Sequence, residues 1–267
     1  MDFKNVILMS DLDGTLLTDD KRIDERDLAA IARFRAGDGL FTAATGRGIA
    51  MAKSVVERLG IDIPCVIFNG AAVYDFREKK FLWHSDMPPC ADDYIRMLEE
   101  RFPDVGIEIL HADSVYVTDD NETVREHMAI EGIEPIRCSL ADVPREDRLK
   151  VLIAYPPERI GEIIDFTRER CAADVNWVHS SPMYYEMLPA GISKGYGFRR
   201  LIELLGRDGL FTVAVGDYGN DTDMVRAADY GAAVANAREE VKRAAKVVLR
   251  DNNHAPISQL IDLIAGL

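Results

Sequence analysis

The sequence lacks any apolar run long enough to cross a membrane. No stretch of the 267 residues approaches the roughly 18 apolar residues that a membrane-spanning helix requires. The first residues, Met1 to Asn5, also lack the basic start and apolar core of a secretory signal. We therefore expect a cytoplasmic protein that has no membrane partner.

Cysteine is scarce and scattered. The four cysteines, Cys65, Cys90, Cys138 and Cys171, form no C-x-x-C pair and have no histidine at ligand spacing. This pattern excludes a zinc site of the usual kind. It favours reduced thiols, which are the rule in the cytoplasm.

Positive charge is in short supply. The chain has 32 Lys and Arg against 46 Asp and Glu, which gives a formal net charge of −14. Such a chain repels the phosphate backbone of nucleic acids and the surface of anionic membranes, so we expect neither as a partner. A small anionic substrate is still compatible, because a metal ion, backbone N–H groups and a few cations can make a local positive site.

Short apolar runs alternate with segments of helical spacing at both ends of the chain. Each run ends in a polar loop, which is typical of parallel strands with helices packed on the sheet. The expected strands are residues 6–9, 40–44, 65–68, 211–215, 231–234 and 246–249, and the first and last helices are residues 24–34 and 256–265.

The middle of the chain has a different pattern. A hairpin is expected within residues 71–83, and beyond it strands and helices are segregated. The parallel-sheet domain, residues 1–83 plus 187–267, is therefore expected to be interrupted by an inserted α+β domain, residues 84–186. Within the insertion we expect helices at 91–102, 122–131 and 157–171 and strands at 114–118, 150–154, 175–178 and 183–187.

Two carboxylates directly follow the first expected strand. Asp11 and Asp13, in the string Asp-Leu-Asp-Gly-Thr, would lie at the carboxyl end of the sheet, where open α/β sheets bind ligands. Residues two apart project to the same side, and Gly14 permits a tight exit. A solvated turn is the commoner fate of such a string. An EF-hand calcium loop is excluded, because its glycine is the sixth residue and here it is the fourth.

A second acidic segment, Gly216 to Asp221, follows another expected strand. Alone it is equally compatible with a helix-capping loop, since Asp and Asn are common N-cap residues. With Asp11 and Asp13, however, Asp217 and Asp221 would crowd one edge of the sheet. Two carboxylates about 4 Å apart repel by roughly 4 kcal/mol, so the cluster requires a cation. Hard oxygen ligands of this kind suit Mg²⁺.

Two further segments offer groups that bind phosphate. Thr45 and Gly46 lie between an expected strand and its helix, where a hydroxyl and N–H groups meet the positive helix end. A simple helix cap is the alternative. Lys194 also opens a helix, where a cation is unfavourable unless an anion is near. A solvated surface lysine is the alternative for Lys194.

In this order and at these strand ends, the segments resemble the haloacid dehalogenase superfamily of phosphotransferases. More narrowly, they are similar to its Cof-type sugar-phosphatase branch. The resemblance covers residues 1–83 and 187–267 and implies a Rossmann-like parallel-sheet core with an inserted α+β cap that sets substrate specificity. The matching segments are Asp11 to Thr15, Thr45, Lys194 and Gly216 to Asp221, with Asn69-Gly70-Ala71 similar to the branch's signature before the cap.

The resemblance implies a Mg²⁺-dependent phosphomonoesterase that acts on small phosphorylated metabolites such as sugar phosphates. Asp11 would be the nucleophile that forms an aspartyl-phosphate, and Asp13 the general acid and base. The metal would be held by Asp11, Asp13, Asp217 and Asp221, and the substrate phosphate by Thr45, Gly46, Lys194 and Asn220.

Two other functions are compatible with the sequence. A phosphomutase or phosphotransferase of the same fold would pass the phosphoryl group to an alcohol instead of water. A non-catalytic binding module would keep the fold alone, and the intact acidic set argues against it. No feature indicates an oligomeric state. Polar and aromatic residues near the end of the insertion are candidates for substrate contact, namely Trp177, His179, Ser180, Tyr184 and Tyr185. Core packing or an interface is the alternative for the aromatics.

Overall fold

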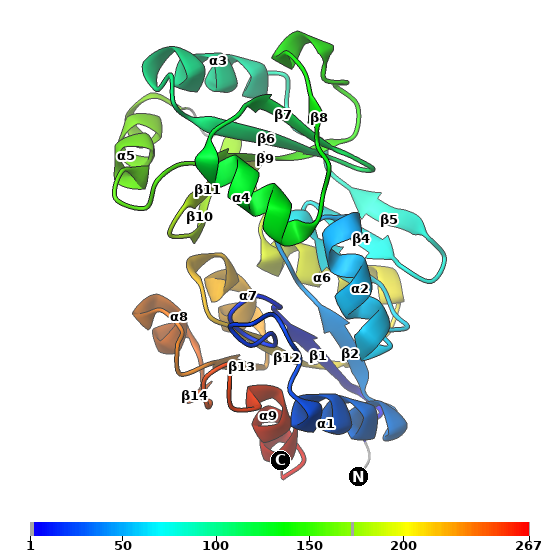
Figure 1. The fold of residues 1–267 in the computed structure, drawn as a ribbon. Helices are drawn as coiled ribbons and strands as arrows, with labels where there is room; N and C mark the ends of the chain where they lie inside the picture. The colour runs from blue at the N-terminus through cyan, green and yellow to red at the C-terminus, as the bar shows by residue number, and fades with distance from the viewer. Residues whose placement is uncertain (1–2, 172–173, 267) are drawn as a thin grey trace. The chain divides into compact units, whose positions relative to one another are not determined.

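The computed structural model describes residues 3–171 and 174–266. Contacts divide the chain into two compact units, each built from segments far apart in the sequence (Figure 1). We call them the core unit and the insertion unit. The core unit comprises Met1–Gly46, Lys53–Trp83 and Ser193–Leu267, and the insertion unit comprises Arg47–Ala52 and His84–Ile192.

A five-stranded parallel sheet forms the centre of the core unit. Its strand order is β14-β13-β12-β1-β2, so the first strand pairs with a strand from the other end of the chain. The register sets Ser10 opposite Val215, which brings the loops after these two strands side by side. The strands are β1 (Val6–Ser10), β2 (Leu40–Ala43), β12 (Phe211–Gly216), β13 (Tyr230–Ala233) and β14 (Val247–Val248).

Helices cover the sheet by burying apolar faces. Ile7 and Met9 of β1 share an apolar cluster with Phe198 of α6 and Met224 of α7. The first helix begins at a cap in which the Asp24 carboxylate accepts the Arg26 N–H, and it packs along the last helix (Figure 1). The helices are α1 (Glu25–Ala36), α2 (Ile49–Leu59), α6 (Lys194–Leu205), α7 (Thr222–Ala227), α8 (Glu239–Ala244) and α9 (Pro256–Ile264). The first residues of α2, up to Ala52, belong to the insertion unit.

A three-stranded sheet carries the chain out of the core unit. It consists of β3 (Cys65–Ile67), β4 (Ala72–Asp75) and β5 (Lys80–His84), and β3 and β4 are antiparallel. A tight 3-10 turn, η1 (Phe68–Gly70), joins β3 to β4.

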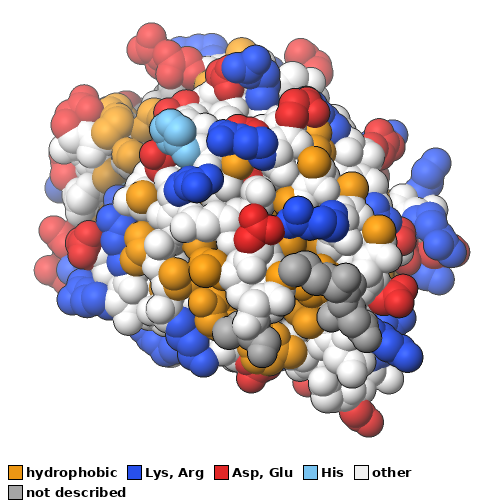
Figure 2. All heavy atoms as spheres, turned by 90° about the horizontal axis from the view of Figure 1, so that it is seen from below, with side chains coloured by type: hydrophobic (Ala, Val, Ile, Leu, Met, Phe, Trp, Pro, Cys, Tyr) orange, Lys and Arg blue, Asp and Glu red, His pale blue; other side chains and the backbone are white. Residues whose placement is uncertain are grey.

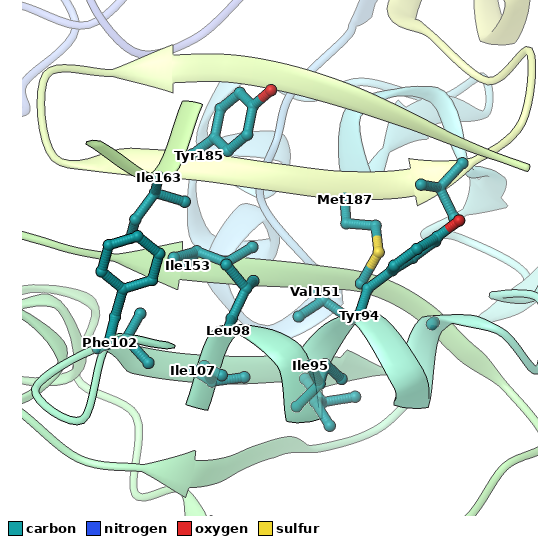
Figure 3. Close-up of a cluster of buried hydrophobic side chains, with 14 of the residues drawn as sticks. Tyr94, Ile95, Leu98, Phe102, Ile107, Val151, Ile153, Ile163, Tyr185 and Met187 are labelled. Carbon is teal, nitrogen blue, oxygen red and sulfur yellow. The ribbon is translucent and has the colours of Figure 1, made fainter. Parts of the chain in front are cut away.

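The insertion unit is built on a six-stranded sheet of order β10-β11-β9-β6-β7-β8, antiparallel except between β7 and β8. One face is apolar: Leu98 of α3 and Phe102, which directly follows this helix, share a buried apolar cluster with Ile153 and Met187 of the sheet (Figure 3). The elements are α3 (Ala91–Arg101), β6 (Gly106–His111), β7 (Val115–Asp119), α4 (Glu122–Glu131), β8 (Ile136–Arg137), β9 (Arg148–Ala154), α5 (Ile160–Arg170), β10 (Val175–Ser181) and β11 (Tyr184–Pro189).

The structure adds strands that the sequence pattern did not predict. The strand β6 lies at the centre of the insertion sheet. Its charged residue Glu108 interrupts the run of apolar residues by which a buried strand is predicted from sequence. Glu108 is fully buried, and its carboxylate lies 2.9 Å from Nδ1 of His127 in α4. The strand β11 continues to Pro189, paired with Val175, and the unit that contains it continues to Ile192.

One face of the molecule shows a mixed distribution of charge. On the face seen in Figure 2, basic and acidic side chains are interspersed and neither sign forms a continuous area. All four cysteines are free thiols. Among residues 3–171 and 174–266, none of the helices combines the length and apolar character that crossing a membrane requires.

Candidate active site

The loop after β1 places its two carboxylates in different environments. Asp11 is 4% exposed, and its N–H donates to the Val215 carbonyl at 3.0 Å, which extends the pairing with β12. The Asp13 side chain is 37% exposed and accepts a hydrogen bond from Lys21 Nζ at 2.7 Å. One carboxylate is therefore enclosed and the other is accessible to water.

Three carboxylates from both ends of the chain meet beside this loop. Asp11, Asp217 and Asp221 each offer an oxygen, and these oxygens lie within 4.8 Å of one another. The hydroxyl of Thr15 donates to Asp217 Oδ1 at 2.8 Å. We call these three side chains the acidic group.

The first loop lies directly against Asp217. Gly14 has a φ of +77°, and a Cβ atom at this position would lie 2.6 Å from Asp217 Oδ2. Glycine is therefore required twice, once for the left-handed backbone and once for the close approach of the carboxylate.

Lys194 joins the two loops. Its Nζ donates to Asp11 Oδ1 and Asp221 Oδ1, both at 2.6 Å, and the residue is 2% exposed. It is the first residue of α6, whose N-terminus is capped by Ser193 accepting the Tyr196 N–H at 3.1 Å. A lysine opposes the helix dipole here, and its two ionic hydrogen bonds outweigh that cost.

Asp221 is a structural anchor within the acidic group. Its Oδ1 accepts from Lys194, and its Oδ2 accepts the N–H groups of Asp217 at 2.9 Å and Tyr218 at 3.1 Å. Both oxygens are thus engaged. Asp221 holds the lysine and shapes the loop that carries Asp217.

Burial and charge shift the pKa values of this site. Burial raises the pKa of Asp11 well above its usual range, Lys194 opposes the shift and the other carboxylates add to it. Burial, together with the charge of Asp221, raises the pKa of Asp217 to about 6. Burial alone would lower the pKa of Lys194, but the charges of Asp11 and Asp221 outweigh burial and raise it.

The acidic group carries an excess of negative charge. Three ionised carboxylates and one ammonium leave two negative charges. A hard divalent cation bound by carboxylate oxygens would balance this charge, so the donor set fits a metal of that kind.

Thr45 and Asn220 are connected through Asn69. The Thr45 N–H donates to the Val66 carbonyl at 3.0 Å, and the Thr45 carbonyl accepts the Asn69 N–H at 2.9 Å. Asn220 Nδ2 in turn donates to Asn69 Oδ1 at 3.0 Å. The sequence pattern did not select Asn69 as a site residue; its only signal there was the Asn-Gly-Ala string.

The structure places every residue predicted for the site in the core unit. Four of them are buried, namely Asp11, Thr45, Lys194 and Asp221, and four are partly exposed, namely Asp13, Gly46, Asp217 and Asn220.

Four of the five residues singled out near the end of the insertion divide into two kinds, and the fifth, His179, has its ring centroid 6.4 Å from that of Tyr185. Trp177 and Tyr185 stack with ring centroids 5.1 Å apart, and both pack in the apolar cluster of the insertion unit. Ser180 donates to Glu186 at 2.5 Å, and the Tyr184 ring lies 4.8 Å from that of His127. The first two residues serve packing, whereas Ser180 and Tyr184 lie among polar groups.

A parallel α/β sheet with this acidic group and lysine at its strand ends agrees with the resemblance to hydrolases of the haloacid dehalogenase type. Residues 8–261 match the family described as haloacid dehalogenase-like hydrolase. The chain belongs to this family, and its resemblance to the Cof-type branch is confirmed.

Two relatives that are similar over most of this chain are named as phosphatases. The chain is 27% identical over 266 residues to the pyridoxal phosphate phosphatase YbhA of Escherichia coli, covering 96% of this chain and 97% of that one. It is 29% identical over 235 residues to the HMP-PP phosphatase of Serratia proteamaculans, covering 87% and 84%. The crystal structure of TM0651 from Thermotoga maritima matches with a TM-score of 0.80 at 28% identity, covering 97% of each chain. The predicted α/β fold and hydrolase class are confirmed.

Proposed function

We propose that this protein is a Mg²⁺-dependent phosphomonoesterase that hydrolyses small phosphorylated metabolites through a phosphorylated Asp11. The observation that carries the proposal is the acidic group with the buried Lys194 beside it, at the carboxyl ends of β1 and β12. The names of the two phosphatase relatives, which act on pyridoxal phosphate and HMP-PP, support the substrate class.

Asp11 and Asp217 would hold the metal ion, with the backbone carbonyl of Asp13 as a further oxygen ligand. Asp221 lies within the same group, and its hydrogen bonds keep Lys194 and Asp217 in place. When bound, Mg²⁺ supplies positive charge against the phosphoryl oxygens and the neighbouring carboxylates.

Asp11 and Asp13 would divide the chemistry between them. The Asp11 carboxylate attacks phosphorus, the new O–P bond forms and the bond to the substrate's ester oxygen breaks. Asp13 gives its proton to the departing alkoxide. Asp13 then takes a proton from water as the water oxygen attacks phosphorus, which releases inorganic phosphate and restores the Asp11 carboxylate. The partial exposure of the Asp13 side chain supports this role. The alcohol that leaves and the water that attacks must both pass between this side chain and the solvent.

Three groups would bind the transferring phosphoryl oxygens. Lys194 contributes a positive charge that its raised pKa maintains, and Thr45 and Gly46 contribute a hydroxyl and an N–H group. Donors fixed in this way favour the transition state, because they need no reorganisation as its charge develops.

The insertion unit would select the part of the substrate that is not phosphate. Its polar groups support this role, since Ser180, Glu186 and Lys150 form a connected set in which Lys150 Nζ lies 2.9 Å from Glu186. Tyr184→Phe and Ser180→Ala are expected to change KM unequally among phosphorylated metabolites. Equal KM changes for all substrates would contradict selection by these residues.

Turnover of p-nitrophenyl phosphate tests the function. Release of p-nitrophenol with Mg²⁺, loss of activity with EDTA and recovery with excess Mg²⁺ are expected. Release of inorganic phosphate without an added alcohol acceptor separates the phosphatase from a phosphomutase or phosphotransferase. No Mg²⁺-dependent turnover of this compound or of a panel of phosphorylated metabolites would contradict the proposal.

A further inference from the structure

We propose that Asn69 is a positioning residue of this active site, which fixes the Thr45 loop and the Asn220 loop relative to each other. The inference rests on the proposed phosphatase function. It assigns a role to a residue outside the acidic group, on the turn η1 that leads out of the core unit.

The backbone of η1 has an uncommon conformation. Phe68 and Asn69 have φ values of 51° and 54°, and Gly70 follows with 98°. Two consecutive non-glycine residues in the left-handed region are rare, although asparagine tolerates it better than most. Such a conformation persists only where surrounding contacts hold it, and it is enriched at functional sites.

The turn is fixed to the Thr45 loop by backbone and side chain. The Asn69 N–H donates to the Thr45 carbonyl at 2.9 Å. A Cβ atom added to Gly46 would lie 3.1 Å from both the Nδ2 and the Oδ1 of Asn69. The amide of Asn69 thus packs directly on the segment proposed to bind phosphate.

The same amide holds the loop after β12. Asn220 Nδ2 donates to Asn69 Oδ1 at 3.0 Å, across 151 residues of sequence, and Asn69 is 1% exposed. Asn220 directly precedes Asp221, which accepts the hydrogen bond from Lys194. A shift of Asn220 therefore moves the residue that positions the lysine.

The turn also touches the start of α6. A Cβ atom on Gly70 would lie 1.9 Å from the carbonyl oxygen of Ser193, the residue that caps the helix opened by Lys194. One short turn therefore contacts the segments that carry Thr45, Lys194 and Asn220. A role limited to packing would need the shape of this turn, whereas positioning also needs the Asn69 amide.

Asn69→Gly separates these two roles, because glycine adopts positive φ without strain and has no amide. The variant is expected to fold, with a thermal midpoint close to that of the wild type. With p-nitrophenyl phosphate and Mg²⁺, kcat is expected to fall about tenfold or more while KM changes less than about threefold, since misplaced groups weaken the transition state most.

A double-mutant cycle with Asn220→Ala tests whether Asn69 acts through Asn220. If it does, the loss of kcat/KM in Asn69→Gly/Asn220→Ala will be close to that of the more impaired single variant. Losses that multiply would show independent effects and overturn the proposal. If the glycine variant does not fold, Asn69→Ser, whose shorter side chain lacks the amide, replaces it in the same cycle and is judged by the same coupling.

Lys79→Gly is the matched control. Lys79 also has a positive φ, 53°, but lies in the exposed turn between β4 and β5. Its activity is expected to equal that of the wild type. If the wild type shows Mg²⁺-dependent turnover and Asn69→Gly keeps more than half of kcat, the positioning role fails and the phosphatase function stands. If the wild type shows no turnover, both fail.

Discussion

At the scale of single residues, Asp11 is the side chain that the proposed chemistry changes covalently. Asp11→Asn keeps the shape of the side chain. Lys194 also keeps its ion pair with Asp221 in this variant. The substitution removes the nucleophilic oxygen, so we expect turnover of p-nitrophenyl phosphate near background with an unchanged fold by circular dichroism. Activity above about a tenth of wild type would contradict the nucleophile assignment.

The contribution of Asp13 to kcat/KM is expected to be larger for substrates whose leaving group is less stable as an anion. Asp13→Asn cannot protonate an alkoxide, so kcat/KM for an alkyl phosphate is expected to fall by about 10²–10⁴. The loss should be much smaller for p-nitrophenyl phosphate, whose leaving group is stable as an anion. The comparison of the two substrates is the measurement, and an equal loss for both would exclude the role of acid.

The sequence predicts which residues could carry the chemistry of the site, but it does not predict the contacts that these residues make with one another. Asp11, Lys194 and Asp217 follow strands or open a helix, and those positions are visible in the apolar pattern. Asn69 could not be assigned a role in this way. Its significance comes from a positive φ and a hydrogen bond to Asn220, which only the folded chain brings within reach.

At the scale of elements, Asp27 links the first and last helices, and its effect on the free energy of unfolding depends on pH. It lies in α1, is fully buried, and its Oδ1 accepts the N–H of Ser258 in α9 at 2.7 Å. Its Oδ2 has no hydrogen-bond partner in the described part of the chain. Burial raises the pKa of Asp27 from 3.8 to about 6, the Ser258 N–H opposes the shift, and Asp24 adds to it.

The sign of the pH dependence follows from this shift. Because the pKa is higher in the folded state, the protonated form contributes stability that is fully present below pH 3.8 and is lost as pH rises through about 6. The loss is about 3 kcal/mol. Asp27→Asn cannot lose a proton, so its free energy of unfolding relative to wild type is expected to rise between pH 4 and 6. Urea unfolding at these pH values measures the difference, and a difference independent of pH would contradict the shift.

At the scale of the whole molecule, the order of strands and helices in the core unit could be predicted because it depends on local apolar runs. The insertion sheet was harder, since β6 carries the buried Glu108 and short β8 has two exposed residues, Ile136 and Arg137. Neither strand has a pattern of its own. Both are defined by their partners in the sheet, which a single segment of sequence does not reveal.

If the acidic group holds Mg²⁺ as proposed, metal binding is also expected to stabilise the core unit. Asp11 and Asp217 come from opposite ends of the chain, and the group has two more negative than positive charges when ionised. Without a cation, this repulsion opposes the pairing of β1 with β12. Mg²⁺ at about 100 times its Kd is expected to stabilise the folded protein by about 2.7 kcal/mol, which raises the thermal midpoint by several degrees.

Thermal unfolding with EDTA or with Mg²⁺, at equal ionic strength set by KCl, measures this effect. The Mg²⁺-dependent increase should largely disappear in Asp217→Asn, which removes one proposed ligand. The midpoint of this variant in EDTA should not fall below that of wild type, because removing one negative charge from the group relieves repulsion. An equal increase in wild type and Asp217→Asn would place the stabilising ion elsewhere, and the acidic group would then lose its role as the metal site.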